Sequence, residues 1–270
     1  MSLLRFVKGH GTENDFVLLP DADVALTPEL VRGLCDRRAG IGADGVLRVE
    51  RRADGWFMDY RNADGSIAEM CGNGIRVFGR HLVDAGLAQP GTLPILTRAG
   101  VRTVQVPPSG DVTVEMGVPA AVEELGAQPE VDGRPGTAVS MGNPHVVVEL
   151  AGLGELAGLD LTRPPSVRPG LPGGQNVEYV VRRRPQLLAM RVHERGVGET
   201  RSCGTGVCAA VVAAVAWSGG AGLDDPWTVD VPGGRLSVTW LSAGPVLLSG
   251  PAVLVARGEV DSAALPVSPG

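Results

Sequence analysis

The chain is predicted to fold as an α+β protein built from two similar halves, on three observations. Short apolar or alternating runs recur through its 270 residues, separated by Gly, Pro and Asp-Gly turns, which is typical of many short β-strands. Few helical patterns accompany them, which favours α+β over a doubly wound parallel sheet. The string Cys-Gly-x-Gly occurs twice, at Cys71 and Cys203, and each time it begins an apolar helix.

The strand predictions follow from these short runs in chain order. They cover residues 16–19, 46–49, 101–106, 112–116, 146–150, 177–181, 188–192, 235–240 and 253–256.

Two helices are predicted directly after the Cys-Gly-x-Gly strings. The first covers residues 72–84, with Ile75, Phe78 and Leu82 at helical spacing, and stops near Gly86. The second covers residues 204–217 and is apolar all round. A helix without a polar face must be buried, so we expect it to lie inside its sheet.

The repeat extends beyond the two cysteines. A shift of 132 positions superposes Met58 on Met190, Asn62 on Glu194 and Cys71 on Cys203. A shift of 129 superposes the string that begins at Asn14 on the string that begins at Asn143. A period near half the chain length indicates duplication rather than a solenoid. The string Met116-Gly117-Val118-Pro119 is a plausible boundary between the halves, and the Gly- and Pro-rich residues 163–174 are expected to form an internal loop.

Composition excludes several partners. The chain is 44% apolar and 20% charged, with a net charge of −6 and a pI near 5.3, as in ordinary globular domains. Its basic residues form no stripe, so no nucleic-acid partner is predicted. The densest basic run, Arg182-Arg183-Arg184 before Pro185, is expected to be a solvated turn. The longest apolar run, residues 207–217, is far below the roughly 20 residues of a membrane span, so no membrane partner is predicted.

The four cysteines do not form a disulfide framework in a chain of this length. There is no Cys-x-x-Cys pair and there are only four histidines, so no metal site is predicted. No secretory signal opens the chain, and a reducing, cytoplasmic location is expected. Cys35 and Cys208 lie in apolar helical contexts and are expected to be small buried hydrophobes.

Cys71 and Cys203 suggest acid–base chemistry. A helix start supplies unpaired N–H groups and partial positive charge, which favour thiolate over thiol. One thiolate and one thiol on opposite faces of a carbon could remove a proton and return another, which inverts that carbon. The N–H groups at Gly72-Asn73 and at Gly204-Thr205 could hold the substrate carboxylate as its α-carbon loses a proton.

Other candidate residues allow two interpretations each. His145 is either a satisfied core histidine or a polar site residue. Glu194-Arg195 is either a surface ion pair of little energetic value or part of the site ahead of the second cysteine. Asn14, Asn62, Asn143 and Asn176 are weak candidates one by one, because Asn is an ordinary turn residue.

With these residues in hand, the chain resembles the diaminopimelate epimerase family. The matching strings span almost the whole chain in order: residues 10–16 (HGTENDF), 40–45 (GIGADG), 61–66 (RNADGS), 70–76 (MCGNGIR), 142–145 (GNPH), 176–178 (NVE) and 193–206.

The resemblance implies a cofactor-independent isomerase that interconverts LL- and meso-diaminopimelate in lysine and peptidoglycan-precursor biosynthesis. It implies that Cys71 and Cys203 are the acid/base residues, and that His145 and Glu194 orient or tune the thiols. It also implies a set of substrate contacts: Asn14, Asn62, Gly72, Asn73, Asn143, Asn176, Glu194, Arg195, Gly204 and Thr205.

The resemblance also implies a fold of two pseudo-symmetric domains, each a strongly curved, mostly antiparallel sheet around a central helix. In that fold the last strand returns to the first domain, which gives halves of residues 1–117 plus 252–270 and residues 118–251. Members of the family are often homodimers, and a homodimer is expected here.

Two positions depart from the family pattern. Glu13 stands where a second Gly is common, and Gly45 stands where some members carry a substrate-contacting Gln, so no contact is assigned to residue 45.

Two alternative functions fit parts of this pattern. A proline or hydroxyproline racemase of the same fold would tend to carry Cys-Gly-His-Gly, whereas this chain has Asn73 and the charged pair Glu194-Arg195. A binding protein or a thiol redox protein would have no need of two distant cysteines.

Overall fold

The computed structural model describes residues 3–21, 23–126, 128–242 and 244–266. The chain divides into two compact units, unit 1 with residues 1–114 and 251–270 and unit 2 with residues 115–250. These limits lie within three residues of the expected halves, 1–117 plus 252–270 and 118–251. Residues 1, 2 and 267–270 of the expected first half lie outside the described residues.

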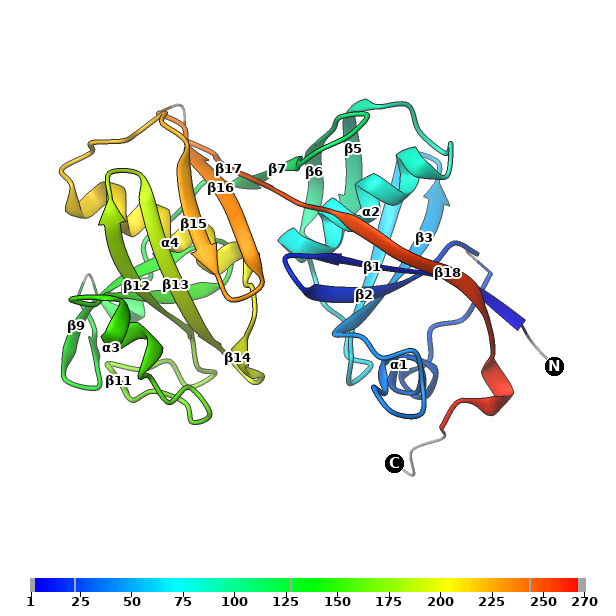
Figure 1. Cartoon of the computed structure of the whole chain (residues 1–270), viewed down its shortest axis with the longest axis horizontal. Helices are drawn as coiled ribbons and strands as arrows, with labels where there is room; N and C mark the ends of the chain where they lie inside the picture. The colour runs from blue at the N-terminus through cyan, green and yellow to red at the C-terminus, as the bar shows by residue number, and fades with distance from the viewer. Residues whose placement is uncertain (1–2, 22, 127, 243, 267–270) are drawn as a thin grey trace. The chain divides into compact units, whose positions relative to one another are not determined.

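Unit 1 is coloured blue to green in Figure 1, with the red C-terminal strand added to it. Its elements are β1 (Leu3–Gly11), β2 (Asn14–Leu19), α1 (Pro28–Cys35), β3 (Gly45–Arg52), β4 (Gly55–Asn62), α2 (Gly72–Asp84), β5 (Gly91–Thr97), β6 (Gly100–Val106), β18 (Val253–Asp261) and the short 3₁₀ helix η2 (Ser262–Ala264). The division between the units falls inside β7 (Val112–Gly117).

Unit 2 runs from green to orange in the same view. Its elements are η1 (Glu123–Leu125), β8 (Glu130–Val131), β9 (Arg134–Ser140), β10 (Pro144–Glu149), α3 (Leu153–Ala157), β11 (Val167–Arg168), β12 (Asn176–Arg184), β13 (Leu187–Glu194), β14 (Gly198–Thr200), α4 (Gly204–Trp217), β15 (Trp227–Val231), β16 (Gly234–Trp240) and β17 (Val246–Gly250).

The two halves share one strand arrangement. Along β1 to β7, neighbouring strands pair antiparallel, parallel, antiparallel, parallel, antiparallel and antiparallel. The series β9, β10, β12, β13, β15, β16 and β17 follows the same sequence of pairings. The predicted repeat is therefore present in the architecture, and most of the strand pairs are antiparallel, as expected.

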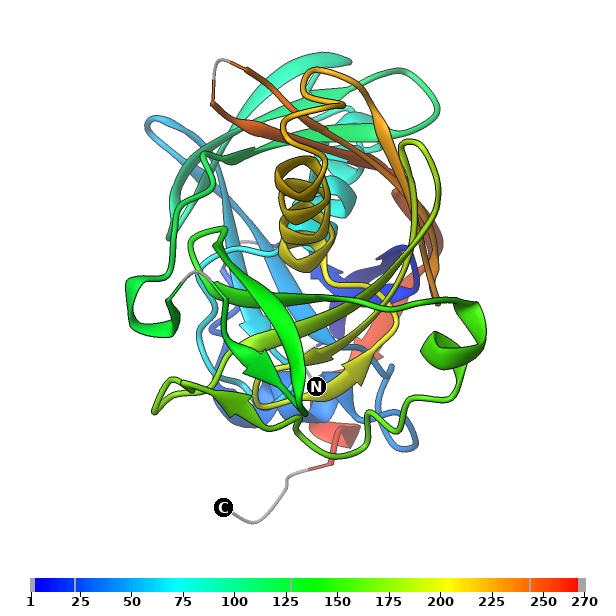
Figure 2. The ribbon, with the colours of Figure 1, turned by 90° about the vertical axis from the view of Figure 1, so that its left-hand side faces the viewer.

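Each sheet wraps around one helix. Helix α2 contacts β1 to β6 and β18, and α4 contacts β9, β10, β12, β13, β16 and β17. Figure 2 shows α4 surrounded by the strands of its own unit. Residues 206–215 of α4 are all buried, which explains why that helix has no polar face.

Helix α2 is enclosed in the same way but buries charged side chains. Arg80 lies almost wholly inside and donates to the carbonyl oxygens of Pro107, Pro108 and Gly110 at 2.8, 3.4 and 3.0 Å. These carbonyls belong to the segment between β6 and β7, so the guanidinium group ties that segment to the helix. A buried cation is tolerated because its donors are used.

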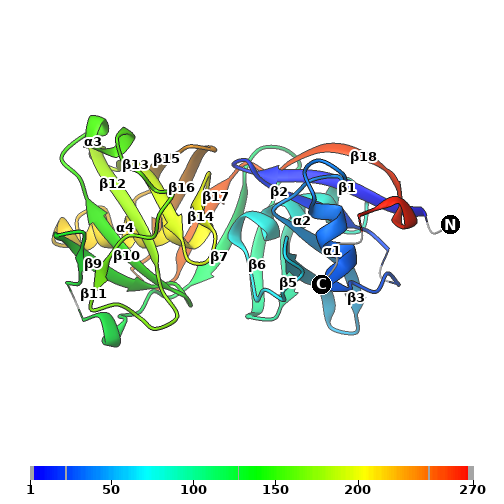
Figure 3. The ribbon, with the colours of Figure 1, turned by 90° about the horizontal axis from the view of Figure 1, so that it is seen from below.

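Strand β18 completes unit 1 from the far end of the chain. It pairs antiparallel with β1 from Leu3↔Asp261 to His10↔Val253, so β1 lies between β18 and β2. Figure 3 shows the two strands side by side. Within the described residues no helix is long and apolar enough to cross a bilayer.

The basic run 182–184 is a correction to the sequence analysis. These arginines lie at the end of β12, not in a turn, and the turn follows at Pro185 and Gln186. Arg182 pairs with Glu149 on the neighbouring strand β10, and Arg183 pairs with Asp230 on β15, which lies on the other side of β13. The expected exposure was right, but cross-strand carboxylates keep the run extended.

The departure at Glu13 lies in the two-residue turn between β1 and β2. Thr12 and Glu13 have φ values of 50° and 62°, both in the left-handed region. A tight hairpin turn requires this conformation, and Gly adopts it with the least strain. The family's usual Gly therefore matches the backbone, and Glu13 adopts the same turn.

We expect Arg80→Met to lower the free energy of unfolding by about 2–3 kcal/mol, because three carbonyls of the segment between β6 and β7 lose their donors. Met keeps the volume of the side-chain stem, so packing changes little. Denaturant unfolding measures the difference. Arg184→Met, at an exposed position at the end of β12, is the control and should change stability little. Equal stability of the two variants would contradict the role of Arg80.

Candidate active site

Both predicted cysteines cap a buried helix. Cys71 precedes α2 with φ −139° and ψ 122°, and Cys203 precedes α4 with φ −116° and ψ 113°. The Gly74 N–H donates to the Cys71 sulfur at 3.5 Å, and the Gly206 N–H donates to the Cys203 sulfur at 3.4 Å. The helix starts therefore present N–H donors and partial positive charge to both sulfurs, as the sequence predicted.

Three predicted residues meet beside the first helix start. The Cys71 thiol donates to Asn14 Oδ1 at 3.7 Å, and Asn73 Nδ2 donates to the same oxygen at 3.1 Å. Asn14 Nδ2 donates to Asp44 Oδ2 at 2.7 Å, which fixes the orientation of the amide. Asn14 begins β2 and Asn73 lies in the first turn of α2, so this group joins a strand to the helix.

Arg76, which sequence reasoning did not select, supports this group from below. It is wholly buried, and its guanidinium donates to Asn73 Oδ1 at 3.0 Å and to the Gly72 carbonyl at 3.1 Å. A Cβ at Gly11 would lie 2.9 Å from an Arg76 nitrogen and 3.2 Å from the Asn73 carbonyl oxygen, so a side chain there would displace the guanidinium group. An arginine inside an apolar helical pattern was the available signal.

An ionic cluster holds the outer side of the Asn14 group. Asp15 accepts from Lys8 at 2.5 Å and from Arg37 at 2.8 Å, and Arg37 also donates to Asp44 at 2.6 Å. Burial alone would raise the pKa of Asp15, but the hydrogen bonds from Arg37 and Lys8 outweigh it and lower the pKa to about 2. The cluster therefore stays ionised and rigid near neutral pH.

Asn62 lies at the end of β4 in its own turn. Its Nδ2 donates to Ser66 Oγ at 3.0 Å, as expected of a turn asparagine. The next residue, Ala63, donates its N–H to the Asp44 carbonyl at 3.1 Å, which links the turn to the residue that orients Asn14. The structure thus places Asn62 beside the cluster, with its amide used within the turn.

Four predicted residues of unit 2 meet at the second helix start. The Cys203 sulfur lies 3.6 Å from Thr205 Oγ1, and Asn143 Nδ2 donates to that hydroxyl at 3.4 Å. His145 Nε2 lies 3.1 Å from Asn143 Oδ1. His145 is therefore both a buried histidine and a partner of the other site residues, so its two interpretations hold together.

Glu178 is the principal residue that sequence reasoning missed. It lies on β12, which pairs parallel with β10, and its Oε1 is 2.7 Å from His145 Nδ1. Both side chains are wholly buried. The string Asn176-Val177-Glu178 was part of the family resemblance, and a carboxylate amid the apolar residues of a buried strand was the signal.

The remaining predicted residues of unit 2 lie where β12 begins and β13 ends. Glu194, at the end of β13, accepts from the Thr200 hydroxyl. Asn176, at the start of β12, accepts from the Arg195 N–H at 2.9 Å. The Arg195 side chain is exposed and approaches the Gly174 carbonyl at 3.4 Å.

Burial and two carboxylates determine the state of Cys203. Burial raises the pKa of its thiol well above the usual value, and the charges of Glu194 and Glu178 raise it further. Hydrogen bonds from Thr205 and the Gly206 N–H act in the opposite direction. The helix start alone suggested a thiolate, but in this structure the thiol is the favoured form of Cys203.

Glu194 is perturbed for related reasons. Burial raises the pKa of its carboxyl group, hydrogen bonds with Thr200 and Cys203 lower it, and the charge of Glu178 raises it again, with a net increase. A carboxyl group with a raised pKa beside a thiol is suited to exchange a proton with it.

Cys35 and Cys208 lie in the apolar interiors of the two units, as the sequence predicted. Cys35 packs in the cluster beneath α1, where burial raises the pKa of its thiol to about 12. Cys208 is wholly buried on α4. Residue 45 has no room for a side chain, because a Cβ there would lie 2.6 Å from the Arg61 carbonyl oxygen.

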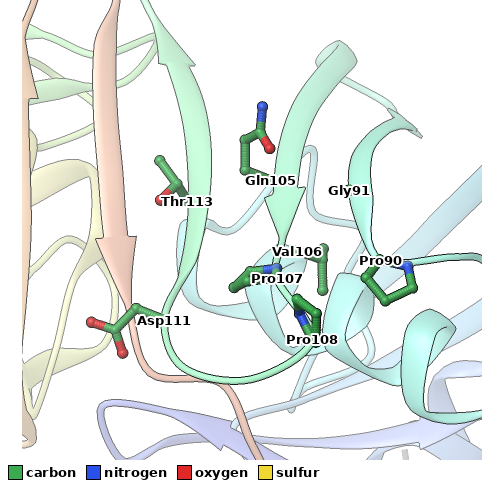
Figure 4. Close-up of a pocket in the computed structure, with 8 residues that line it drawn as sticks. All are labelled: Pro90, Gly91, Gln105, Val106, Pro107, Pro108, Asp111 and Thr113. Atoms are coloured by element: carbon green, nitrogen blue, oxygen red, sulfur yellow. The ribbon is translucent and has the colours of Figure 1, made fainter.

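Within the described ranges, no cluster of three His, Cys, Asp or Glu side chains is arranged to hold a metal ion. A pocket of about 380 Å³ lies beside β5, β6 and β7 and is shown in Figure 4. It contains none of the predicted site residues, and Asp111 is its only charged lining residue. The pocket therefore adds nothing to the chemistry of the cysteines.

The family model for diaminopimelate epimerase matches residues 6–122 and 137–255. The chain belongs to the diaminopimelate epimerase family. The diaminopimelate epimerase of Streptomyces coelicolor is 51% identical over 284 residues, covering 96% of each chain. That of Thermobifida fusca is 49% identical, covering 97% of this chain and all of the relative. The predicted family and the predicted class, an isomerase of lysine biosynthesis, are confirmed.

Solved structures confirm the predicted fold class. A phenazine biosynthesis protein of the PhzF family from Bacillus anthracis matches with a TM-score of 0.75 at 18% identity, covering 96% of this chain and 99% of that one. A probable proline racemase from Agrobacterium radiobacter matches with a TM-score of 0.71 at 15% identity, covering 96% and 93%. At these identities the likeness concerns the fold alone.

The repeat provides a matched pair of substitutions at Gly206 and Gly74. A Cβ at Gly206 would lie 2.5 Å from Glu178 Oε1 and 3.2 Å from the Cys203 sulfur, whereas the nearest atoms at Gly74 are at 3.4 Å. We expect Gly206→Ala to lower the free energy of unfolding by about 1–3 kcal/mol and to displace the second cysteine's surroundings. Gly74→Ala should change the free energy of unfolding by less than about 1 kcal/mol. Thermal and denaturant unfolding measure both, and equal effects would contradict the packing described.

The Asp15 cluster makes acid stability partly dependent on one carboxylate. Its pKa is lowered on folding, so its contribution is present above the unfolded pKa near 4 and is lost as the pH falls towards about 2. The contribution amounts to about 2 kcal/mol. Asp15→Asn should therefore flatten the fall of unfolding free energy over this range. Asp54→Asn, at an exposed turn position, should leave the profile unchanged.

Proposed function

We propose that this chain interconverts LL- and meso-diaminopimelate with Cys71 and Cys203 as its two acid–base residues. The observation that carries the proposal is that two equivalent helices, one in each half of a duplicated fold, are both capped by a cysteine. Membership of the family supports the substrate. Duplicated caps provide one thiol for each face of a carbon that must be inverted.

In this mechanism one cysteine thiolate removes the α-proton and the other cysteine thiol protonates the opposite face. After one turnover the two protonation states are exchanged, so the reverse reaction is served equally. Burial and neighbouring carboxylates favour the thiol of Cys203, which is the form the proton donor must have. Glu194 and His145 lie in the same group and adjust the state of that thiol.

The substrate carboxylate is held by backbone N–H groups at the helix starts, at Gly72-Asn73 and Gly204-Thr205. Negative charge grows beside this carboxylate as the α-carbon loses its proton, so these donors stabilise the transition state more than the ground state. The remaining proposed contacts, from amide and charged side chains, are Asn14, Asn62, Asn143, Asn176, Glu194 and Arg195. No cofactor takes part in this scheme. A cytoplasmic location and a homodimer are proposed on the family resemblance.

Solvent exchange tests the reaction. LL-diaminopimelate incubated with the protein in deuterated water should acquire deuterium at the inverted α-carbon as the meso isomer forms, because the returning proton comes from a solvent-exchanged thiol. Mass spectrometry and chiral chromatography measure both. L-Proline is the control and should acquire none. Exchange on proline but not on diaminopimelate would show that the substrate is wrong.

Cysteine substitutions test the mechanism. Cys71→Ser and Cys203→Ser should each fold normally and lose epimerisation by about 10²–10⁴-fold or more, because a hydroxyl is a far weaker acid than a thiol. The double variant should be hardly worse than either single variant, since the two act as a unit. Cys35→Ser and Cys208→Ser should keep the chemistry. Near-normal epimerisation by either of the first two variants would refute the two-base assignment.

A further inference from the structure

A line of hydrogen bonds in unit 2 begins at buried Glu178 and ends at the sulfur of Cys203. The four contacts are Glu178 Oε1 to His145 Nδ1 at 2.7 Å, His145 Nε2 to Asn143 Oδ1 at 3.1 Å, Asn143 Nδ2 to Thr205 Oγ1 at 3.4 Å, and Thr205 Oγ1 to Cys203 Sγ at 3.6 Å. Glu178 lies on β12, His145 on β10 and Asn143 directly before β10, while Thr205 lies in the first turn of α4 and Cys203 caps that helix.

The donors of this line point towards the sulfur. Asn143 presents its Nδ2 to Thr205, so its Oδ1 faces His145 and can only accept. His145 Nε2 must therefore carry a proton. Thr205, which accepts from Asn143, keeps its own hydroxyl proton for the Cys203 sulfur. Hydrogen bonds in such a series polarise one another and strengthen the last one.

Glu178 determines the other side of the imidazole. With Nε2 protonated, the contact between Nδ1 and Glu178 Oε1 holds one further proton, on either the ring or the carboxyl group. In both cases the pair as a whole is neutral. The charge of Glu178 by itself would raise the thiol pKa of Cys203, but the proton shared with His145 offsets that charge. Neutrality suits the site, because both side chains are wholly buried and Glu178 Oε2 has no hydrogen-bond partner among the described residues.

Unit 1 shows that the fold itself does not need this pair. In the repeat, His145 corresponds to Phe16. His145 pairs with Asn176 on the neighbouring strand, and Phe16 pairs with Gly45. Glu178 and Leu47 each lie two residues after these partners, so they correspond to each other. A Cβ at Gly74 would lie 3.4 Å from side-chain atoms of Phe16 and Leu47, and a Cβ at Gly206 would lie 2.5 Å from Glu178 Oε1. The same place beneath the helix start is thus apolar in one half and ionisable in the other.

The two sulfurs consequently have different partners. The Cys71 thiol donates to the Asn14 amide oxygen, whereas Cys203 lies at the accepting end of the line. The groups that titrate around Glu178 come from three elements: His145 on β10, Glu194 on β13 and Cys203 at the start of α4.

We propose that Glu178 is a positioning residue for Cys203: by sharing one proton with His145, it keeps His145 Nε2 as the donor that starts the line through Asn143 and Thr205 to the sulfur. This inference rests on the proposed acid–base role of Cys203. The line stabilises the thiolate each time Cys203 gives up its proton, against the burial that favours the thiol.

The thiol pKa of Cys203 is the direct readout. It is measured from the ultraviolet absorbance of the thiolate against pH, as the difference between each protein and the same protein carrying Cys203→Ser. Glu178→Leu introduces the residue found at the equivalent place in unit 1, so packing is preserved while the proton is lost. It should raise the thiol pKa by about 1–2 pH units and lower kcat about tenfold or more, with KM little changed.

Two further variants separate this role from others. Glu178→Gln can still donate to His145 Nδ1 from its amide, so the thiol pKa should stay within about half a pH unit of the parent. In a Thr205→Val background, which lacks the last link, Glu178→Leu should have no further effect on the thiol pKa. Glu149→Gln, an exposed carboxyl group on β10, is the control and should change neither readout.

Three results would overturn the proposal. One is an unchanged thiol pKa in Glu178→Leu, and another is the full effect of that variant in the Thr205→Val background. The third is a thiol pKa in Glu178→Gln that is lower than in the parent. That result would mean that Glu178 carries an unshared negative charge, which raises the thiol pKa in the parent and is removed by the substitution. The proposed function is tested separately, because loss of epimerisation in Cys203→Ser supports it whatever Glu178 does, and the absorbance measurement does not depend on turnover.

Discussion

The cap of a buried helix by a cysteine is the interaction on which the rest of each unit depends. The Gly74 and Gly206 N–H groups donate to the two sulfurs. A Cβ at residue 206 would lie 2.5 Å from Glu178 Oε1 and 3.2 Å from the Cys203 sulfur, so a larger residue there would disturb the cap, whereas a Cβ at residue 74 would make only ordinary contacts. The helix can be enclosed only if strands contact it on several sides, which the wrapped sheets provide. The position of each thiol therefore depends on the buried helix that it caps, and that helix depends on the strands that enclose it.

The sequence predicted the helices well because their ends carry local signals. The bounds of α2 and α4 agree with the predicted 72–84 and 204–217, since the Cys-Gly-x-Gly strings mark the caps. Strands were predicted less completely. In β1, two of the inward positions are the glycines Gly9 and Gly11, so the apolar alternation that identifies a strand is absent. The return of β18 to β1 involves residues about 250 positions apart and came only from the family resemblance.

The sequence predicted candidate site residues where a motif marks them, and it did not predict contacts that only packing creates. Asn14, Asn143 and His145 lie in strings that repeat, whereas Glu178 acts on His145 across a parallel strand pair, 33 residues along the chain. Arg76 supports Asn73 from the same helix, but a helical arginine normally suggests an exposed face. A single sequence contains no information on which strands become neighbours, so contacts of this kind need the structure.

Duplication explains why the two halves share a fold, and the difference between them indicates where function has been added. Phe16 and Leu47 fill the space beneath one helix start by packing alone, so that space can be closed without polar groups. Filling the equivalent space with His145 and Glu178 instead buries two ionisable groups, which costs free energy. The proposed sharing of one proton makes the pair neutral and reduces this cost. The proposed inversion needs one acid and one base at a time, and a fold with two identical surroundings would give both thiols the same tendency to hold a proton. Surroundings that differ at this buried pair, as well as in the side chains beside each sulfur, let the two thiols differ while the capping geometry stays the same.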